Sequence, residues 1–124
     1  MPSKALRILI AEDLPDTARM LTAFLKLEGH AVRVAEDGEE AVSMALLTRP
    51  DAIILDIGLP KMSGYEVAER IRAEAWGRET LIIAVSGYSE PGYIEAAERA
   101  GMDHYLVKPA DPVKILELLN SIMA

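Results

Sequence analysis

Apolar residues divide the chain into two alternating kinds of segment. Short, mostly apolar runs predict strands at 6–11, 31–35, 52–55, 81–85 and 105–107. Between and after them, apolar residues recur every three or four positions, which predicts helices over about 15–28, 38–49, 65–75, 93–100 and 112–122. Strands that alternate with helices favour an α/β fold with a mostly parallel sheet.

Residues at segment ends support these boundaries. Pro112 directly after Asp111 is a favoured helix start, and Pro50 ends the second predicted helix. The alternating run 31–35 predicts an edge strand, whereas the wholly apolar run 52–55 predicts a strand buried on both faces. The helix positions expected to face the core are Ala18, Leu21, Phe24 and Leu25; Ala41, Val42, Ala45 and Leu46; Val67, Ala68 and Ile71; and Val113, Leu116, Leu118 or Leu119, and Ile122.

Length and composition place these elements in one domain. Of the 124 residues, 51% are hydrophobic, so residues 1–124 are expected to form a single domain. No apolar stretch could span a membrane and no signal-peptide core is present, which favours the cytoplasm. Cysteine is absent, which excludes thiol nucleophiles and Cys-ligated metals. A net charge of −7 disfavours nucleic acid and membrane surfaces and favours a protein partner.

Residues suited to phosphoryl chemistry directly follow four of the predicted strands. In chain order they are Glu12 and Asp13, Asp56, Ser86 and Lys108. The carboxyl ends of parallel strands lie at one edge of a sheet, where ligands of open α/β sheets bind. These side chains are therefore expected to converge.

Each of these residues also has a simpler structural explanation. Asp13 could cap the first helix, Lys108 could form only a salt bridge, and Ser86 could be a turn residue. Asp56 is harder to explain in this way, because it precedes a loop. Clustered carboxylates need a cation, and oxygen ligands suit Mg²⁺. Together with an ammonium and a hydroxyl, they favour phosphoryl transfer to an aspartate.

Four short motifs stand in order along the chain. They are Ile10–Asp13, Leu55–Pro60 with Met62 and Gly64, Val85–Gly87, and Ala100–Gly101 followed by Tyr105–Pro109. Together they resemble the response-regulator receiver domain of two-component signalling, over nearly the whole chain. The resemblance implies a flavodoxin-like, doubly wound sheet of five parallel strands in the order 2-1-3-4-5, with five helices.

The resemblance implies a role for each acid. Asp56 matches the residue that accepts the phosphoryl group, and Asp13 matches a direct Mg²⁺ ligand. Glu12 would act on the metal mostly through water, and Gly58 would offer its backbone carbonyl. The implied Mg²⁺ site is therefore Glu12, Asp13, Asp56 and Gly58.

Further residues are implied to respond to the phosphoryl group. Lys108 would pair with one phosphoryl oxygen, and Ser86 would hydrogen-bond another. Tyr105 matches the aromatic switch residue, which turns inward when the Ser86 hydroxyl is drawn toward the phosphate. The Lys108–Pro109 peptide bond is implied to be cis.

Several positions differ from the commonest family pattern. Ala110 stands where Phe is frequent, which is expected to alter partner docking, and Ser86 replaces the commoner Thr. Gly58 has no side chain to steer the hydrolytic water, and Tyr88 is expected to shield the acyl phosphate. These features predict slow to moderate self-dephosphorylation and no other enzymatic activity.

Outside the site, His30 and His104 are expected to be solvated surface residues, because metal sites need several ligands together. Trp76 is expected to pack at the end of the third helix.

Three functions are open at this point. The first is a signalling switch that accepts a phosphoryl group from a histidine kinase or phosphotransfer protein. Its fourth helix, fifth strand and fifth helix would bind a target or a second copy of the chain. The second is a Mg²⁺-dependent phosphohydrolase, disfavoured because Gly58 stands where such enzymes usually carry a second acid. The third is an interaction module without phosphorylation. The segments Leu59-Pro60 and Gly64–Val67 also resemble receivers of hybrid histidine kinases.

Overall fold

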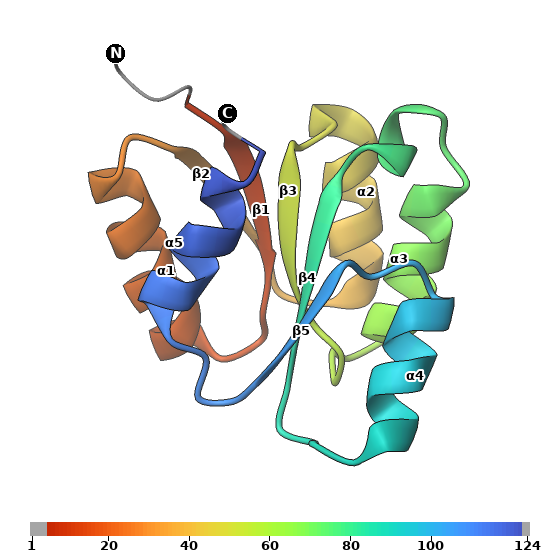
Figure 1. Cartoon of the computed structure of the whole chain (residues 1–124). Coiled ribbons are helices and arrows are strands. Elements are labelled where there is room, and N and C mark those ends of the chain that lie inside the picture. The colour runs from red at the N-terminus through yellow and green to blue at the C-terminus, as the bar shows by residue number, and fades with distance from the viewer. Residues whose placement is uncertain (1–4, 123–124) are drawn as a thin grey trace.

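A computed structural model describes residues 5–122 of the chain. Five parallel strands form one sheet in the order β2-β1-β3-β4-β5 (Figure 1), which confirms the predicted order. The strands are β1 (Arg7–Ala11), β2 (Ala31–Ala35), β3 (Ala52–Asp56), β4 (Leu81–Ser86) and β5 (His104–Val107). The predicted strand ends differ from these by at most one residue.

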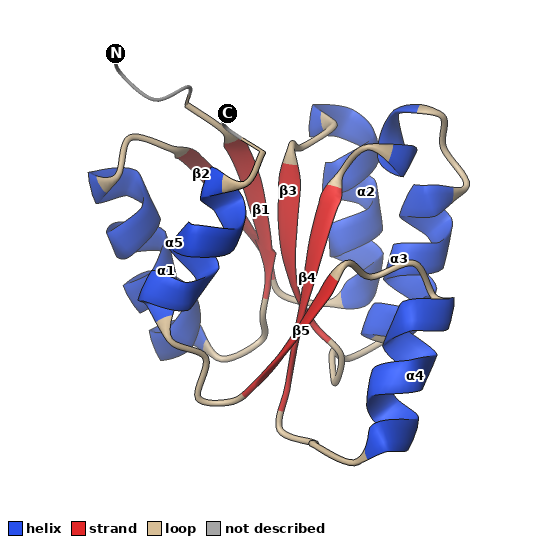
Figure 2. Ribbon diagram, viewed as in Figure 1, coloured by secondary structure: helices blue, strands red, loops and turns tan. Residues whose placement is uncertain are grey.

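Helices cover both faces of the sheet (Figure 2). They are α1 (Pro15–Leu27), α2 (Gly38–Thr48), α3 (Gly64–Arg72), α4 (Pro91–Arg99) and α5 (Pro112–Asn120), and a short 3-10 helix (Trp76–Arg78) follows α3. Helices α1 and α5 lie on one face, and α2, α3 and α4 lie on the other (Figure 1). The doubly wound α/β fold is therefore confirmed, although α3 ends three residues earlier than predicted.

Two apolar cores, one on each face, hold these layers together. Strands β3 and β4 are buried throughout, whereas exposed and partly buried residues alternate in β2, as predicted for central and edge strands. On one face, Leu21 and Leu25 of α1 belong to the same buried cluster as Ile115 and Leu119 of α5. The packing fixes the strand ends from which the polar residues of the candidate site project.

Three predicted core positions are wrong, because Leu46, Val113 and Ile122 are exposed. The buried residues of α5 are Ile115 and Leu119, which are one turn apart. Val113 lies two residues before Ile115 and therefore points about 200° away from it around the helix. Ile122 lies beyond the end of α5, and Leu46 lies at the margin of the buried stripe of α2.

His30 is buried rather than solvated, so this prediction is wrong. The backbone N–H of Leu6 donates to His30 Nδ1 at 3.1 Å, so the imidazole replaces a backbone acceptor just before β1. His104 is partly exposed. Trp76 packs against the core as predicted, although it lies four residues beyond the end of α3, at the start of the 3-10 helix. Among the helices of the described region, none combines the length and apolar character needed to cross a membrane.

Candidate functional site

The predicted site residues meet at the carboxyl edge of the sheet. Ala11 of β1 is in register with Leu55 of β3, so Glu12 and Asp56 leave adjacent strands side by side. Asp56 is in register with Val85 of β4, one residue before Ser86. Neighbouring strands therefore deliver these polar groups to one place, as the sequence pattern predicts.

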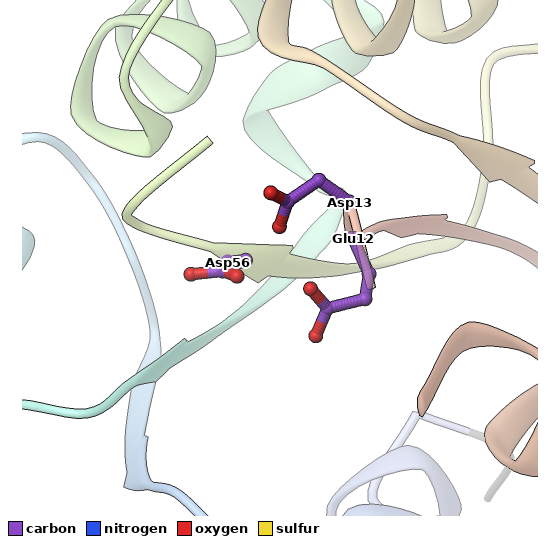
Figure 3. A group of neighbouring side chains, drawn as sticks. All are labelled: Glu12, Asp13 and Asp56. Carbon is purple, nitrogen blue, oxygen red and sulfur yellow. The ribbon is translucent and has the colours of Figure 1, made fainter. Parts of the chain in front are cut away.

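Three carboxylates form the centre of the site (Figure 3). Oxygens of Glu12, Asp13 and Asp56 lie within 4.8 Å of one another, and Glu12 and Asp13 extend toward Asp56. Glu12 and Asp56 are buried, whereas Asp13 is exposed. An all-oxygen set with an open, exposed side fits Mg²⁺, which takes one or two carboxylates and keeps several waters. No other metal-ligating group of three or more acids, His or Cys occurs among residues 5–122.

Both oxygens of Asp56 have partners. The Lys108 ammonium lies 2.8 Å from Asp56 Oδ2 and 3.4 Å from Glu12 Oε1. The backbone N–H of Gly58 donates to Asp56 Oδ1 at 2.9 Å. Gly58 therefore contacts the Asp56 carboxylate through its amide. This contact was not predicted from the sequence, where only the Gly58 carbonyl has an expected role.

Burial and the neighbouring charges shift the pKa values of Glu12 and Lys108. Burial raises the pKa of Glu12, and the Asp56 charge adds to this, although the Leu14 N–H and Lys108 act in the opposite direction. Burial alone would lower the pKa of Lys108, but its hydrogen bond to Asp56 and the two carboxylate charges outweigh it and raise the pKa. The site therefore keeps Lys108 charged and holds Glu12 in an environment that favours its protonated form.

Ser86 and Tyr105 are linked through the backbone of Tyr88. The buried Ser86 Oγ accepts a hydrogen bond from the Tyr88 N–H at 3.1 Å, and the Tyr105 hydroxyl donates to the Tyr88 carbonyl at 2.7 Å. The two predicted switch residues therefore bind opposite sides of one residue in the β4–α4 loop. This link could not be read from spacing alone.

The Tyr88 side chain lies against α4. Its ring stacks on Tyr93, with centroids 4.5 Å apart and planes 11° apart, and the Tyr65 hydroxyl donates to the Tyr93 carbonyl at 3.3 Å. This tyrosine cluster was not predicted from the sequence. Since the Tyr88 ring is half-exposed and stacked, its expected shielding of an acyl phosphate stays a prediction.

The last loop completes the site. The Lys108–Pro109 peptide bond is cis, which confirms the prediction, and the Lys108 N–H donates to the Ser86 carbonyl at 2.7 Å. Beyond Lys108, a cavity of about 340 Å³ extends from Asp56 between α1 and α5, and Ala110 is among its lining residues. The small side chain of Ala110 leaves this space open.

Comparisons with known proteins identify the family of the chain. Residues 8–120 match the model of the response regulator receiver domain. Protein PilH of Pseudomonas aeruginosa is 31% identical over 118 residues, which cover 95% of this chain and 98% of PilH.

Two solved structures share the fold closely. Chemotaxis protein CheY4 of Vibrio cholerae is 28% identical with a TM-score of 0.89, and the match covers 96% of this chain and 99% of CheY4. The receiver domain of sensor histidine kinase PA1611 from Pseudomonas aeruginosa, solved with a magnesium ion coordinated in the active site cleft, is 35% identical with a TM-score of 0.86. That match covers 95% of this chain and 97% of the solved one. The chain therefore belongs to the response regulator receiver domains of two-component systems.

Proposed function

We propose that the chain is a phosphorylation-dependent switch whose phosphoacceptor is Asp56. The observation that carries the proposal is the contact of one ammonium, Lys108 Nζ, with both Asp56 and Glu12 in a cluster of three carboxylates. Phosphoryl transfer depends on positioning and charge neutralisation, and this arrangement supplies both.

Mg²⁺ is the proposed cofactor. The carboxylates of Asp13 and Asp56 and the backbone carbonyl of Gly58 would hold it, and Glu12 would act through water. When bound, the ion supplies positive charge that offsets the carboxylates and the phosphoryl oxygens. The magnesium ion in the related PA1611 receiver domain supports this assignment.

The proposed donor is a phosphohistidine of a histidine kinase or phosphotransfer protein. A carboxylate oxygen of Asp56 forms the new bond to phosphorus while the phosphorus–nitrogen bond breaks. The electron pair of that bond stays on the imidazole of the donor. Lys108 exchanges its 2.8 Å contact with Asp56 for a phosphoryl oxygen, and therefore keeps a negative partner throughout.

Ser86 and Tyr105 would transmit the change. The Ser86 hydroxyl turns to donate to a phosphoryl oxygen and alters its present bond to the Tyr88 N–H. The Tyr88 carbonyl moves with its loop, and Tyr105 loses its 2.7 Å partner and turns inward. The exposed surface of α4, β5 and α5 thereby changes, and this surface would bind the downstream protein or a second copy of the chain.

Other functions receive less support. A phosphohydrolase would need an acid near Asp56 to protonate a leaving group, and Gly58 stands in the expected place. A module without phosphorylation would not need Lys108 between two buried carboxylates. We propose no enzymatic activity beyond self-phosphorylation and slow self-dephosphorylation. A stand-alone regulator and a receiver of a hybrid kinase would share this chemistry, and the cytoplasmic location stays a prediction.

Intact mass spectrometry of the full chain with Mg²⁺ and acetyl phosphate tests the proposal. A stable adduct of one phosphoryl group, absent in Asp56→Asn, is the expected result. Sustained turnover of a phosphorylated metabolite would favour the phosphohydrolase instead. Absence of any adduct under these conditions would favour an inert interaction module.

A further inference from the structure

The loop between β3 and α3, residues 57–63, passes the proposed phosphoacceptor and is fixed at both ends. At the end near β3, the Ile57 N–H donates to the Val85 carbonyl at 3.1 Å. At the end near α3, the Gly64 N–H donates to the Ile57 carbonyl at 3.0 Å. A Cβ on Gly64 would lie 2.7 Å from the Asp56 carbonyl oxygen, which shows how closely α3 approaches the backbone of β3. The middle of the loop is held by a different element, the start of α2.

Gly38, the first residue of α2, packs directly on this loop. Its N–H donates to the Pro60 carbonyl at 3.1 Å. A Cβ at position 38 would lie 2.6 Å from Met62 Cβ and 2.7 Å from the Met62 carbonyl carbon, and it would overlap the Met62 carbonyl oxygen. Because most of these atoms are backbone, a side chain at position 38 can fit only if the loop moves.

An ion pair supports the same contact. Asp37 Oδ2 lies 3.5 Å from Lys61 Nζ, while Asp37 Oδ1 accepts the N–H of Glu40 at 2.8 Å and caps α2. Lys61 has a φ of 70°, a left-handed conformation that non-glycine residues rarely adopt. Asp37 therefore caps α2 and contacts the loop at the same time.

We propose that Gly38 is a positioning residue for phosphoryl acceptance. Its contact with Pro60 and Met62 sets the loop so that the Gly58 amide holds Asp56 Oδ1 and the Gly58 carbonyl stays available to Mg²⁺. The inference rests on the proposed function, because it concerns how Asp56 is held for the incoming group. Only one residue separates Gly58 from the segment that α2 contacts, so a displaced loop displaces Gly58 as well.

Gly38→Ala in the full chain tests the inference. We expect the Mg²⁺ dissociation constant to rise about 10-fold or more, as when an outer contact of a metal site is lost. The rate of phosphorylation by acetyl phosphate should fall about 10- to 100-fold, because a small misplacement of reacting groups is costly. In the metal-free protein, the Gly58 amide proton should leave its wild-type NMR position and exchange faster with solvent.

Gly92→Ala is the matched control. Gly92 is the second residue of α4, and nothing lies within 4 Å of the position its Cβ would occupy. This variant should bind Mg²⁺ and accept the phosphoryl group as the wild type does. Thermal unfolding of both variants identifies the temperatures at which they are folded, and Mg²⁺ affinity is compared at those temperatures. If Gly38 had a purely structural role, Gly38→Ala would lower the melting temperature without changing Mg²⁺ affinity.

Lys61→Met is the second variant, because it removes the ion pair and adds no clash. Its Mg²⁺ affinity should fall about 2-fold, since exposed ion pairs are weak. A folded Gly38→Ala protein with wild-type Mg²⁺ affinity and an unmoved Gly58 amide would overturn the inference. If Gly38→Ala does not fold, wild-type behaviour of Lys61→Met would overturn it. Failure of the wild type to accept a phosphoryl group would contradict the proposed function, while the Gly58 amide signal still decides the positioning role.

Discussion

Lys108 and Asp56 form an ion pair across the carboxyl edge of the sheet, with Nζ 2.8 Å from Oδ2. Lys108 follows β5 and Asp56 ends β3, so the pair joins strands that are separated in the sheet by β4. The same ammonium lies 3.4 Å from Glu12 Oε1. The positive charge of Lys108 therefore offsets the charges of both buried acids.

Lys108→Met should separate metal binding from phosphoryl acceptance. Mg²⁺ should bind more tightly, because the ion no longer competes with an ammonium for Asp56. Phosphorylation by acetyl phosphate should slow by about 100-fold or more, because a donor to the transferred group is lost. Mg²⁺ titration and intact-mass time courses measure the two effects, and the exposed Lys114→Met is the control. Weaker Mg²⁺ binding in Lys108→Met would contradict the claim that Lys108 competes with Mg²⁺ for Asp56.

The strand ends could be predicted from the sequence because their chemistry is local. A polar residue after an apolar run lies at a sheet edge, and parallel pairing brings Asp56, Ser86 and Lys108 together without further information. The strand order itself came from the family resemblance. Contacts made by backbone groups could not be predicted in this way, because their donors and acceptors have no sequence signature.

Two residues illustrate this limit. Tyr88 joins Ser86 to Tyr105 through its N–H and its carbonyl, and any residue except Pro at position 88 would offer both groups. His30 is buried, and its Nδ1 accepts the Leu6 N–H, a contact between segments that are distant in sequence. Both contacts depend on how the strands are placed, which periodicity alone does not specify.

Glu12 should cost the metal-free protein stability at neutral pH. Burial, and next the Asp56 charge, raise its pKa above the ordinary value of 4.5. Because the pKa of Glu12 is higher in the folded state than in the unfolded state, protonated Glu12 favours folding. This contribution is fully present below pH 4.5 and is lost as pH rises through the folded-state pKa. Glu12→Gln should therefore raise the free energy of unfolding at neutral pH.

Urea unfolding without metal measures this effect. The difference between Glu12→Gln and the wild type should shrink as pH falls through the folded-state pKa of Glu12, and it should be absent below pH 4.5, where Glu12 is protonated in both states. Added Mg²⁺ should stabilise the wild type more than the variant, because the variant lacks one of the acids around the ion. The exposed Glu69→Gln is the control for loss of a charge. A stability gain that does not vary with pH would argue against ionised Glu12 as its cause.

Ser86→Ala should uncouple phosphorylation from the movement of Tyr105. Asp56 should still accept the phosphoryl group under the proposed function, but position 86 no longer has a hydroxyl to turn toward it. NMR of the tyrosine rings, with Tyr105 assigned through Tyr105→Phe, should show a shift on beryllofluoride binding in the wild type and none in Ser86→Ala. Ser86→Thr keeps the hydroxyl and should keep the shift. A full shift of the Tyr105 signal in Ser86→Ala would show that Ser86 does not transmit the change from Asp56 to Tyr105.

Ala110→Phe should stabilise the protein by filling the cavity beside the site. Ala110 packs against the core that contains Leu21 and Ile115, and all three line the cavity of about 340 Å³. A ring placed there would bury apolar area without displacing a polar contact of Asp56. Cavity filling commonly adds about 0.5–2 kcal/mol to the free energy of unfolding, which urea titration measures.

Acetyl phosphate should phosphorylate Ala110→Phe at nearly the wild-type rate, because Asp56 and Lys108 keep their geometry. Ala110→Ser, which adds little volume, is the control and should not gain stability. A loss of stability in Ala110→Phe would mean that the ring overpacks the space between α1 and α5. A slower reaction with acetyl phosphate, at unchanged Mg²⁺ affinity, would instead show that this cavity is part of the path by which a phosphoryl donor reaches Asp56.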